Sequence, residues 1–212
     1  MRNRLVVYPD LTLAVPPRYC GTIDYYAAIA SFGQSMVVSD ARFDKRQKDV
    51  HRTVIADVNG ALRLTVPVAK PESASQARWS DIKVSDHGNW ADVHRTALES
   101  AYGRTPYFEY YAPRFLPLLV ADNQPVVELD SSIDAEIRRI LMLPPPVSES
   151  IGGRVVDYLA EEARFSYAPV PYYQVRAGRL GFIPHLSVLD LIFNMGPESV
   201  LVLQQMIKQS HG

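Results

Sequence analysis

The dipeptide Asn59-Gly60 constrains the fold of this 212-residue chain more than any other short feature. It stands between two runs rich in β-branched and apolar residues, 52–58 and 62–68. Asn-Gly suits a two-residue hairpin turn because both central positions of that turn need positive φ. The sequence therefore predicts an antiparallel β-hairpin at this point.

The residues before this hairpin indicate a parallel β-α-β unit. Residues 4–9 and 35–40 are short apolar runs typical of strands. Between them, residues 23–30 place apolar side chains at helical spacing, with Thr22 as the expected N-cap. Residues 80–86 are a further candidate strand. We expect an N-terminal sheet of roughly four or five strands that includes the hairpin.

From about residue 87 the pattern becomes helical. Helices are predicted over residues 90–102, 106–119 (broken by Pro113 and Pro117), 131–143 (with Ser132 as N-cap), 153–165, 187–195 and 197–209. We therefore expect an α/β fold, with a mixed sheet in the N-terminal half and a mainly helical C-terminal half packed on it. Residues 1–212 are expected to form one domain, strand-rich over about 1–86 and helix-rich over about 87–212.

Composition narrows the class of protein. Hydrophobic residues make up 47% of the chain and charged residues 21%, as in globular proteins. The net charge of −1 gives no basic field for nucleic acid or an anionic membrane. No apolar run reaches membrane-spanning length, and Asp10 interrupts the apolar N-terminal stretch, so we expect neither membrane insertion nor a signal peptide. The single cysteine, Cys20, excludes an internal disulfide and fits a cytoplasmic protein.

Familiar phosphate-loop, dinucleotide, nucleophile-elbow and zinc-helix motifs are missing from the sequence, and no spacing of histidine, cysteine or acidic residues proposes a metal site. One polar cluster covers residues 43–52 and leads into the first strand of the hairpin. Its composition favours a solvated loop. The alternative is an anion site in which Arg52, with Arg46 or Lys48, holds a phosphate or carboxylate.

A second candidate is His94, which lies close to the apolar face of the predicted helix 90–102. Histidine at such a position is more often a satisfied core residue than a catalyst. If His94 is functional, it is the natural general base, because imidazole ordinarily titrates near neutrality.

The third cluster lies in the apolar helix 187–195, where Asp190 and Asn194 share one face. A buried acid must be paired or change its protonation state. Asp190 is also a capping candidate, three residues after Ser187. Asn194 has its own simple interpretation as a polar residue near a helix end.

Four segments carry a family resemblance. Residues 172–203, YYQVRAGRLGFIPHLSVLDLIFNMGPESVLVL, resemble the pattern Tyr-x-Gln-x-Phe followed by Gly-Phe-x-Pro-Asn-Leu-Ser-Ile-Leu-Asp-Leu-Leu-Phe-Asn-x-Gly-Pro-Glu. Residues 90–111 are similar to the pattern Trp…His…Ala-Leu-x-x-x-Tyr…Pro-Tyr-Phe. Residues 45–68 are similar to Lys-Gln-x-Tyr-x-Asn-Arg…Ile…Asn-Gly…Leu-Thr-Ile-Pro-Val. Residues 16–29 are similar to Pro-x-x-x-Tyr-Phe-x-x-Ile. These are patterns of the WbqC-like family. Residues 112–171 match poorly.

The resemblance implies a bacterial enzyme of surface-polysaccharide (O-antigen-like) biosynthesis, of transferase type, that tailors an activated sugar or related precursor. On the matching positions, we expect His94 as general base, Asp190 orienting His94 or a substrate hydroxyl, and substrate contacts from Gln47, Arg52, Tyr102 and Asn194. The expected partner is a small molecule, for example a nucleotide sugar or an acyl donor. Neither a cofactor nor an oligomeric state is indicated. The alternative is a non-catalytic binding or scaffold protein of the same pathway.

Two positions depart from the family pattern. Its Asn before the arginine is His51 here, and its Asn before Leu-Ser is His185. Imidazole offers one donor and one acceptor on a ring in place of an amide. No role is therefore carried over to these two positions.

Overall fold

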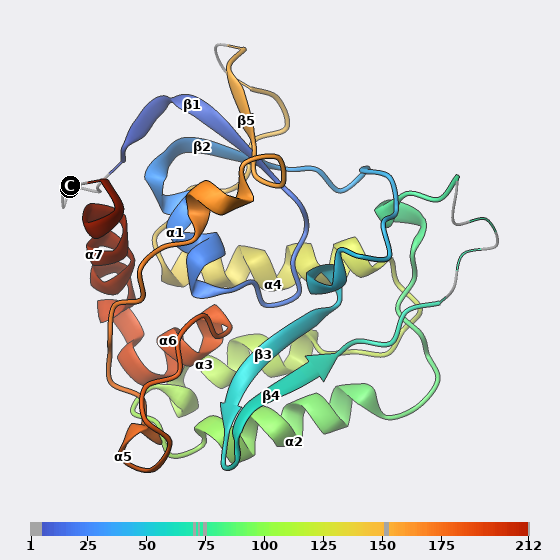
Figure 1. The fold of residues 1–212 in the computed structure, drawn as a ribbon. Coiled ribbons are helices and arrows are strands. Elements are labelled where there is room, and N and C mark those ends of the chain that lie inside the picture. The colour runs from blue at the N-terminus through green and yellow to red at the C-terminus, as the bar shows by residue number, and fades with distance from the viewer. Residues whose placement is uncertain (1–5, 70, 72, 74–75, 151–152, 212) are drawn as a thin grey trace.

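The computed structural model of the chain describes residues 6–69, 71, 73, 76–150 and 153–211 (Figure 1). The strands are β1 (Tyr8–Val15), β2 (Phe32–Val37), β3 (Arg52–Asp57), β4 (Gly60–Thr65) and β5 (Val155–Asp157). The α-helices are α1 (Ile23–Ser31), α2 (Trp90–Tyr102), α3 (Phe108–Phe115), α4 (Val126–Ile140), α5 (Ala177–Leu180), α6 (Val188–Met195) and α7 (Ser199–His211). Short 3₁₀ turns are η1 (Lys48–Val50), η2 (Trp79–Asp81), η3 (Leu116–Leu118), η4 (Glu162–Phe165) and η5 (Gly196–Glu198). The predicted mixed α/β class is confirmed.

The three-stranded sheet has the order β2-β1-β5, and both pairings are parallel. The β1-α1-β2 start is confirmed, although β1 begins later than predicted, and residues 1–5 lie outside the described residues. The predicted helix 153–165 is wrong. Residues 155–157 instead pair with residues 12–14 of β1, and 3₁₀ turn η4 follows. Because this pairing joins segments far apart in sequence, no local pattern reveals it.

The predicted hairpin is confirmed as the antiparallel pair β3–β4. Asp57 pairs with Gly60, so the turn residues are Val58 and Asn59. Among residues 58, 59 and 60, only Gly60 has a positive φ, which is 113°. The hairpin forms its own two-stranded sheet, so the expected single sheet of four or five strands is wrong (Figure 1). Residues 80–86 form no named strand; Lys83 and Val84 make only isolated bridges.

The helices around the hairpin and the core largely follow the predicted ranges. Helix α2 ends at Tyr102 as expected, and Gly103 caps it. Helix α4 begins at Val126, earlier than predicted, and the hydroxyl of Ser131 donates to the carbonyl of Val127 inside the helix. Ser187 caps α6, because its hydroxyl accepts from the Leu189 N–H at 3.3 Å.

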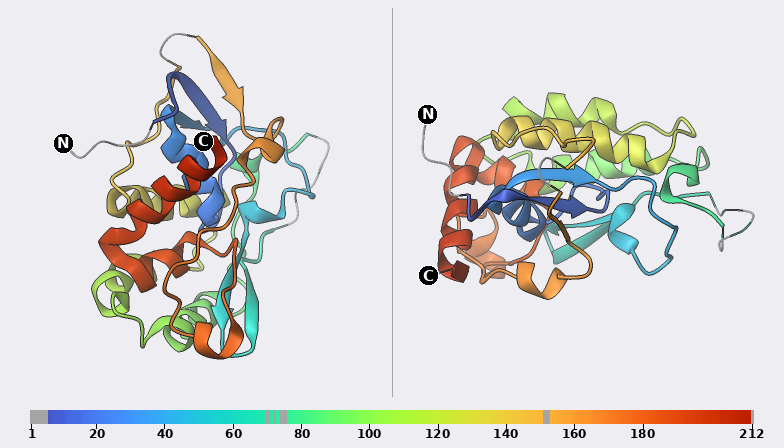
Figure 2. Two further views of the ribbon diagram at one scale, coloured as in Figure 1. Left: turned by 60° about the vertical axis from the view of Figure 1, so that its left-hand side comes forward. Right: turned by 90° about the horizontal axis from the view of Figure 1, so that it is seen from above.

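One apolar core draws on segments from β1 to α7. Its centre includes Phe193 of α6, whose ring lies 5.3 Å from Tyr102, 5.1 Å from Phe108 and 6.1 Å from Phe115, between centroids. Every residue of α1 is buried, and α7 packs against it (Figure 2). This packing fixes α1 and the loop before it. In the described part of the chain, no helix has the length and apolar character needed to cross a membrane.

Candidate functional site

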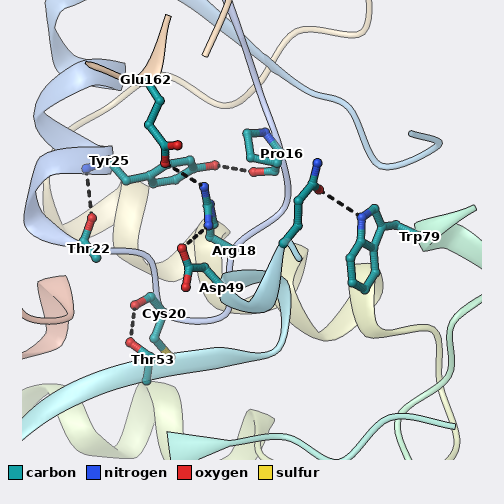
Figure 3. Close-up of polar contacts among 10 residues, drawn as sticks. Pro16, Arg18, Cys20, Thr22, Tyr25, Asp49, Thr53, Trp79 and Glu162 are labelled. Carbon is teal, nitrogen blue, oxygen red and sulfur yellow. Dashed lines mark hydrogen bonds and ion pairs between the residues drawn. The ribbon is translucent and has the colours of Figure 1, made fainter. Parts of the chain in front are cut away.

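The loop between β1 and α1, residues 16–22, lies at the carboxyl end of the parallel sheet. From β1 the chain goes to β2 on one side, whereas β5 pairs on the other. In open parallel sheets, ligands bind outside the carboxyl ends of strands where the order reverses in this way. Tyr25 of α1 holds this loop in place, because its hydroxyl donates to the carbonyl of Pro16 at 2.9 Å (Figure 3).

Hydrogen bonds join this loop to two distant segments. The hydroxyls of Thr53 and Ser187 both donate to the carbonyl of Cys20, at 2.8 and 2.9 Å. The Ile23 N–H donates to the carbonyl of Leu186 at 3.0 Å. Strand β3 and the segment before α6 are therefore brought to the start of α1.

A cleft of about 260 Å³ opens where these segments meet. Its ionisable lining residues come from four separate segments of the chain: Arg18, Asp24, Asp49, Arg52, Glu162 and His185. Gly21 and Thr22, at the N-terminus of α1, also line it. The cleft thus combines two guanidinium groups and a helix N-terminus with three carboxylates, so the positive potential available to an anion lies where the carboxylates leave a guanidinium unpaired.

Arg18 is the fixed cation of the cleft. Its side chain is only 8% exposed and forms ion pairs with Asp49 and, at 3.6 Å, with Glu162 (Figure 3). The guanidinium also lies 5.9 Å from the ring centroid of Tyr158. Both acids offset the charge of Arg18, and the three contacts hold its orientation.

Arg52 has no such compensation at its Nε. This half-buried residue begins β3 and lines the cleft, and its Nε is buried with no hydrogen-bond partner in the described part of the chain. A buried N–H of a charged group that stays unpaired costs free energy. Arg52 is the predicted site residue that the structure places in this cleft.

His185 and Asp24 form a polar pair at the same cleft. The Nδ1 of His185 lies 2.9 Å from Oδ2 of Asp24, a residue that is 8% exposed. The other carboxylate oxygen of Asp24 is buried, and no described residue forms a hydrogen bond with it. The imidazole is 47% exposed. His185 has a φ of 57°, in the left-handed region that Asn tolerates better than most residues.

His94 lies elsewhere, in the core between α2 and the loop after β1. It is 2% exposed, its Nδ1 is 2.8 Å from the hydroxyl of Tyr19, and its ring packs edge-on against Trp90 at 5.2 Å. Burial lowers the pKa of His94 to about 4, although a hydrogen bond with the Thr65 backbone opposes this. The imidazole is therefore neutral at physiological pH.

Asp190 is the centre of a buried hydrogen-bond network. Its Oδ2 accepts from the hydroxyl of Tyr172 at 2.5 Å and from Nε2 of Gln174 at 3.0 Å. Burial raises the pKa of Asp190, and the hydrogen bonds from Tyr172, Tyr102 and Gln174 oppose that rise. The predicted capping box with Ser187 is wrong, because the Ser187 N–H donates to the carbonyl of Val54 at 2.8 Å and not to the Asp190 carboxylate.

Tyr102 and Asn194 belong to the same network. The hydroxyl of Tyr102 accepts from the Ala56 N–H at 3.2 Å. The amide of Asn194 accepts from the Val175 N–H at 3.0 Å and donates to the carbonyl of Asp190 at 2.8 Å. Three of the predicted residues are thus together, and they tie the segment before α6 to the hairpin and to α2.

The remaining predicted residue, Gln47, accepts at its Oε1 from the indole N–H of Trp79 at 3.1 Å. Figure 3 shows Trp79 apart from the ion pairs of Arg18. Arg46, the other anion-site candidate, is exposed and paired with Asp44. The predicted site residues therefore lie in four separate parts of the structure. Among the described residues, Arg52 lines the cleft, whereas His94 and Asp190 do not. Their catalytic roles stay predictions.

A comparison with family models assigns the chain. The model described as WbqC-like protein family matches residues 17–157, more than half of the sequence. The chain belongs to the WbqC-like protein family. Searches of curated proteins and of solved structures find no match. The matched range contains Arg18, Asp24 and Arg52 of the cleft; the resemblance of residues 172–203 lies beyond it.

Sequence reasoning missed Arg18 and Asp24 in this WbqC-like protein. A signal for Arg18 was present, because a charged residue directly after the first strand of a β-α-β unit lies at the ligand-binding edge. Asp24 looked like an ordinary first-turn acid. As for metals, no group of three or more histidine, cysteine or acidic side chains within the described residues could hold an ion.

Proposed function

We propose that this WbqC-like protein is a transferase-type enzyme of bacterial surface-polysaccharide biosynthesis and that the cleft beside α1 holds the anionic part of an activated sugar. The observation that carries this proposal is Arg52, which lines the cleft at the carboxyl edge of the parallel sheet and whose Nε has no hydrogen-bond partner among the described residues. Arginine binds phosphate and carboxylate oxygens through parallel N–H donors.

The charges of the cleft indicate how the ligand would be held. Arg18 is offset by Asp49 and Glu162, so direct contact with an anion falls to Arg52. The N-terminus of α1, at Gly21 and Thr22, adds positive potential. Sites for whole drug-sized ligands occupy roughly 300–1,000 Å³. A cleft of about 260 Å³ therefore fits a diphosphate or a sugar, and the rest of a nucleotide sugar would extend outside it.

The experiment is a thermal-shift measurement with UDP-N-acetylglucosamine, inorganic pyrophosphate and acetyl-coenzyme A, on wild type and on Arg52→Gln. A ligand that binds only the native state raises its melting temperature. We expect UDP-N-acetylglucosamine and pyrophosphate to raise the melting temperature of wild type and to have a smaller effect on the variant. Absence of a shift with every ligand would count against the proposal.

One observation favours a second candidate, a non-catalytic ligand-binding protein of the same pathway. The predicted general base, His94, is buried beside Tyr19 and Trp90. Incubation of the protein with the ligand that shifts its melting temperature and with acceptor sugars distinguishes the two candidates. Product formation supports the transferase, and binding without product supports the second candidate.

A further inference from the structure

We propose that His185 and Asp24 are the general-base pair of the cleft, with Asp24 as the positioning residue and Nε2 of His185 as the proton acceptor. This inference rests on the proposed function for the cleft itself. In this proposal Arg52 remains the contact for the anion, and His94 keeps its structural contacts in the core.

The geometry of the pair fixes which nitrogen is available. With Oδ2 of Asp24 2.9 Å from Nδ1, a neutral His185 keeps its proton on Nδ1 and its lone pair on Nε2. The carboxylate is held in the buried first turn of α1, whereas the imidazole is 47% exposed at the cleft. A base oriented by a buried acid and open to the ligand is the arrangement that general-base catalysis requires.

Arg52 and His185 reach the cleft from adjoining segments. The Ser187 N–H donates to the carbonyl of Val54 at 2.8 Å, which sets the segment that carries His185 beside β3. Arg52 begins that strand, and both side chains line the cleft. A ligand with its anionic part at Arg52 would therefore place a neighbouring hydroxyl or amine toward His185.

The chemical step follows from this placement. Nε2 takes the proton of an acceptor hydroxyl or amine while that oxygen or nitrogen bonds to the group carried by an activated donor. The bond between this group and the donor breaks, and its electron pair leaves with the donor fragment. The imidazolium then returns the proton to that fragment. The acidic carboxylate of Asp24 stabilises the imidazolium between the two events.

Two measurements test the pair without a known reaction. The first is nitrogen-15 NMR of the histidine rings, with the His185 signal assigned by its loss in His185→Asn. We expect neutral His185 to be in the Nδ1–H form in wild type and to lose that preference in Asp24→Ala. An Nε2–H form in wild type would overturn the proposal. A merely structural role for Asp24 would leave the tautomer unchanged in Asp24→Ala.

The second measurement follows the modification of histidines by diethyl pyrocarbonate with mass spectrometry, with and without inorganic pyrophosphate. His87, whose side chain is 95% exposed, is the internal control, and buried His94 should stay unmodified. With pyrophosphate at ten times its dissociation constant, modification of His185 should slow about tenfold and that of His87 should not change.

Calorimetry separates the two possible failures. If pyrophosphate binds in an Arg52-dependent manner but does not protect His185, the pair does not face the ligand, and this inference fails while the function of the cleft stands. If pyrophosphate and UDP-N-acetylglucosamine both fail to bind, the proposed function fails, and the inference that rests on it fails too.

Discussion

The imidazole Nδ1 of His94 lies 2.8 Å from the hydroxyl of Tyr19, and both side chains are almost fully buried. Burial opposes a positive charge on the ring and lowers the pKa of His94 to about 4. The core therefore contains a neutral histidine whose protonation should destabilise the fold. This makes His94 a pH-sensitive stability element, whatever its part in catalysis.

We predict that His94→Gln weakens the acid sensitivity of the fold. The folded pKa of about 4 lies below the ordinary value of 6.5. The contribution of the neutral ring is therefore fully present above pH 6.5 and is lost as pH falls to about 4. Between pH 7 and pH 4, this loss amounts to about 3 kcal/mol of unfolding free energy. Urea unfolding at the two pH values, with His87→Gln as the exposed control, measures it. An unchanged loss in His94→Gln would contradict the account.

Asp130→Asn should stabilise the protein at neutral pH. Asp130 of α4 is 2% exposed, and among the residues that the structure describes neither of its carboxylate oxygens has a hydrogen-bond partner. Burial and the neighbouring Asp134 raise the pKa of Asp130, and Arg18 opposes the rise. The stability contributed by the protonated acid is present at low pH and is lost as pH rises through the folded pKa.

We expect Asp130→Asn to add about 1–3 kcal/mol to the unfolding free energy at pH 7, and this gain should shrink as pH falls toward 4. Chemical unfolding across this range gives the measurement. Asp10→Asn, at an exposed position of β1, is the matched control and should change little. A loss of stability in Asp130→Asn would show that the carboxylate has a partner in solution.

Asp190→Ala should destabilise the fold by about 3 kcal/mol, because it removes the acceptor of the Tyr172 hydroxyl and one of the three acceptors of the Gln174 amide. Hydrogen exchange over residues 172–183 should rise at the same time. Asp92→Ala is the control; it removes only an exposed ion pair with Arg95 and should cost less than about 1 kcal/mol. Wild-type stability in Asp190→Ala would instead favour the catalytic role predicted from the sequence.

Gly196→Ala should be strongly destabilising. Gly196 has a φ of 53°, and a Cβ there would lie 2.5 Å from the ring of Tyr107. Positive φ and overlap with an aromatic ring together should cost more than about 2 kcal/mol. Gly178→Ala in α5 is the matched control, since a Cβ there meets nothing within 4 Å. Equal melting temperatures for the two variants would contradict the close contact between Gly196 and the ring of Tyr107 at η5.

Local signals explain which parts of the fold were predictable. Asn59-Gly60 marked the hairpin, although only Gly60 has positive φ, and Ser187 marked the start of α6. Strand β5 was missed because three residues carry no local pattern, and their place depends on pairing with β1. The start of α4 was missed because Ser132 looked like an N-cap, yet it lies inside the helix, where the neighbouring Ser131 hydroxyl bonds back to the carbonyl of Val127.

The candidate site was predictable only in part for the same reason. Arg52 stood out because it follows a polar cluster and begins a strand. The pairing of His185 with Asp24 joins residues 161 positions apart, which no single segment can reveal. Asp190 and Asn194 were correctly expected on one helix face, but the partners that satisfy them come from the segment 172–175.

The most direct test of the central claim is isothermal titration calorimetry of inorganic pyrophosphate with wild type, Arg52→Gln and Arg46→Gln. Arg46 is the charge-matched control, exposed and paired with Asp44 outside the cleft. Loss of charge-assisted hydrogen bonds should weaken binding to Arg52→Gln by about 10- to 100-fold. Binding to Arg46→Gln should stay at the wild-type level. Equal affinities for all three proteins would contradict the assignment of the cleft as an anion site.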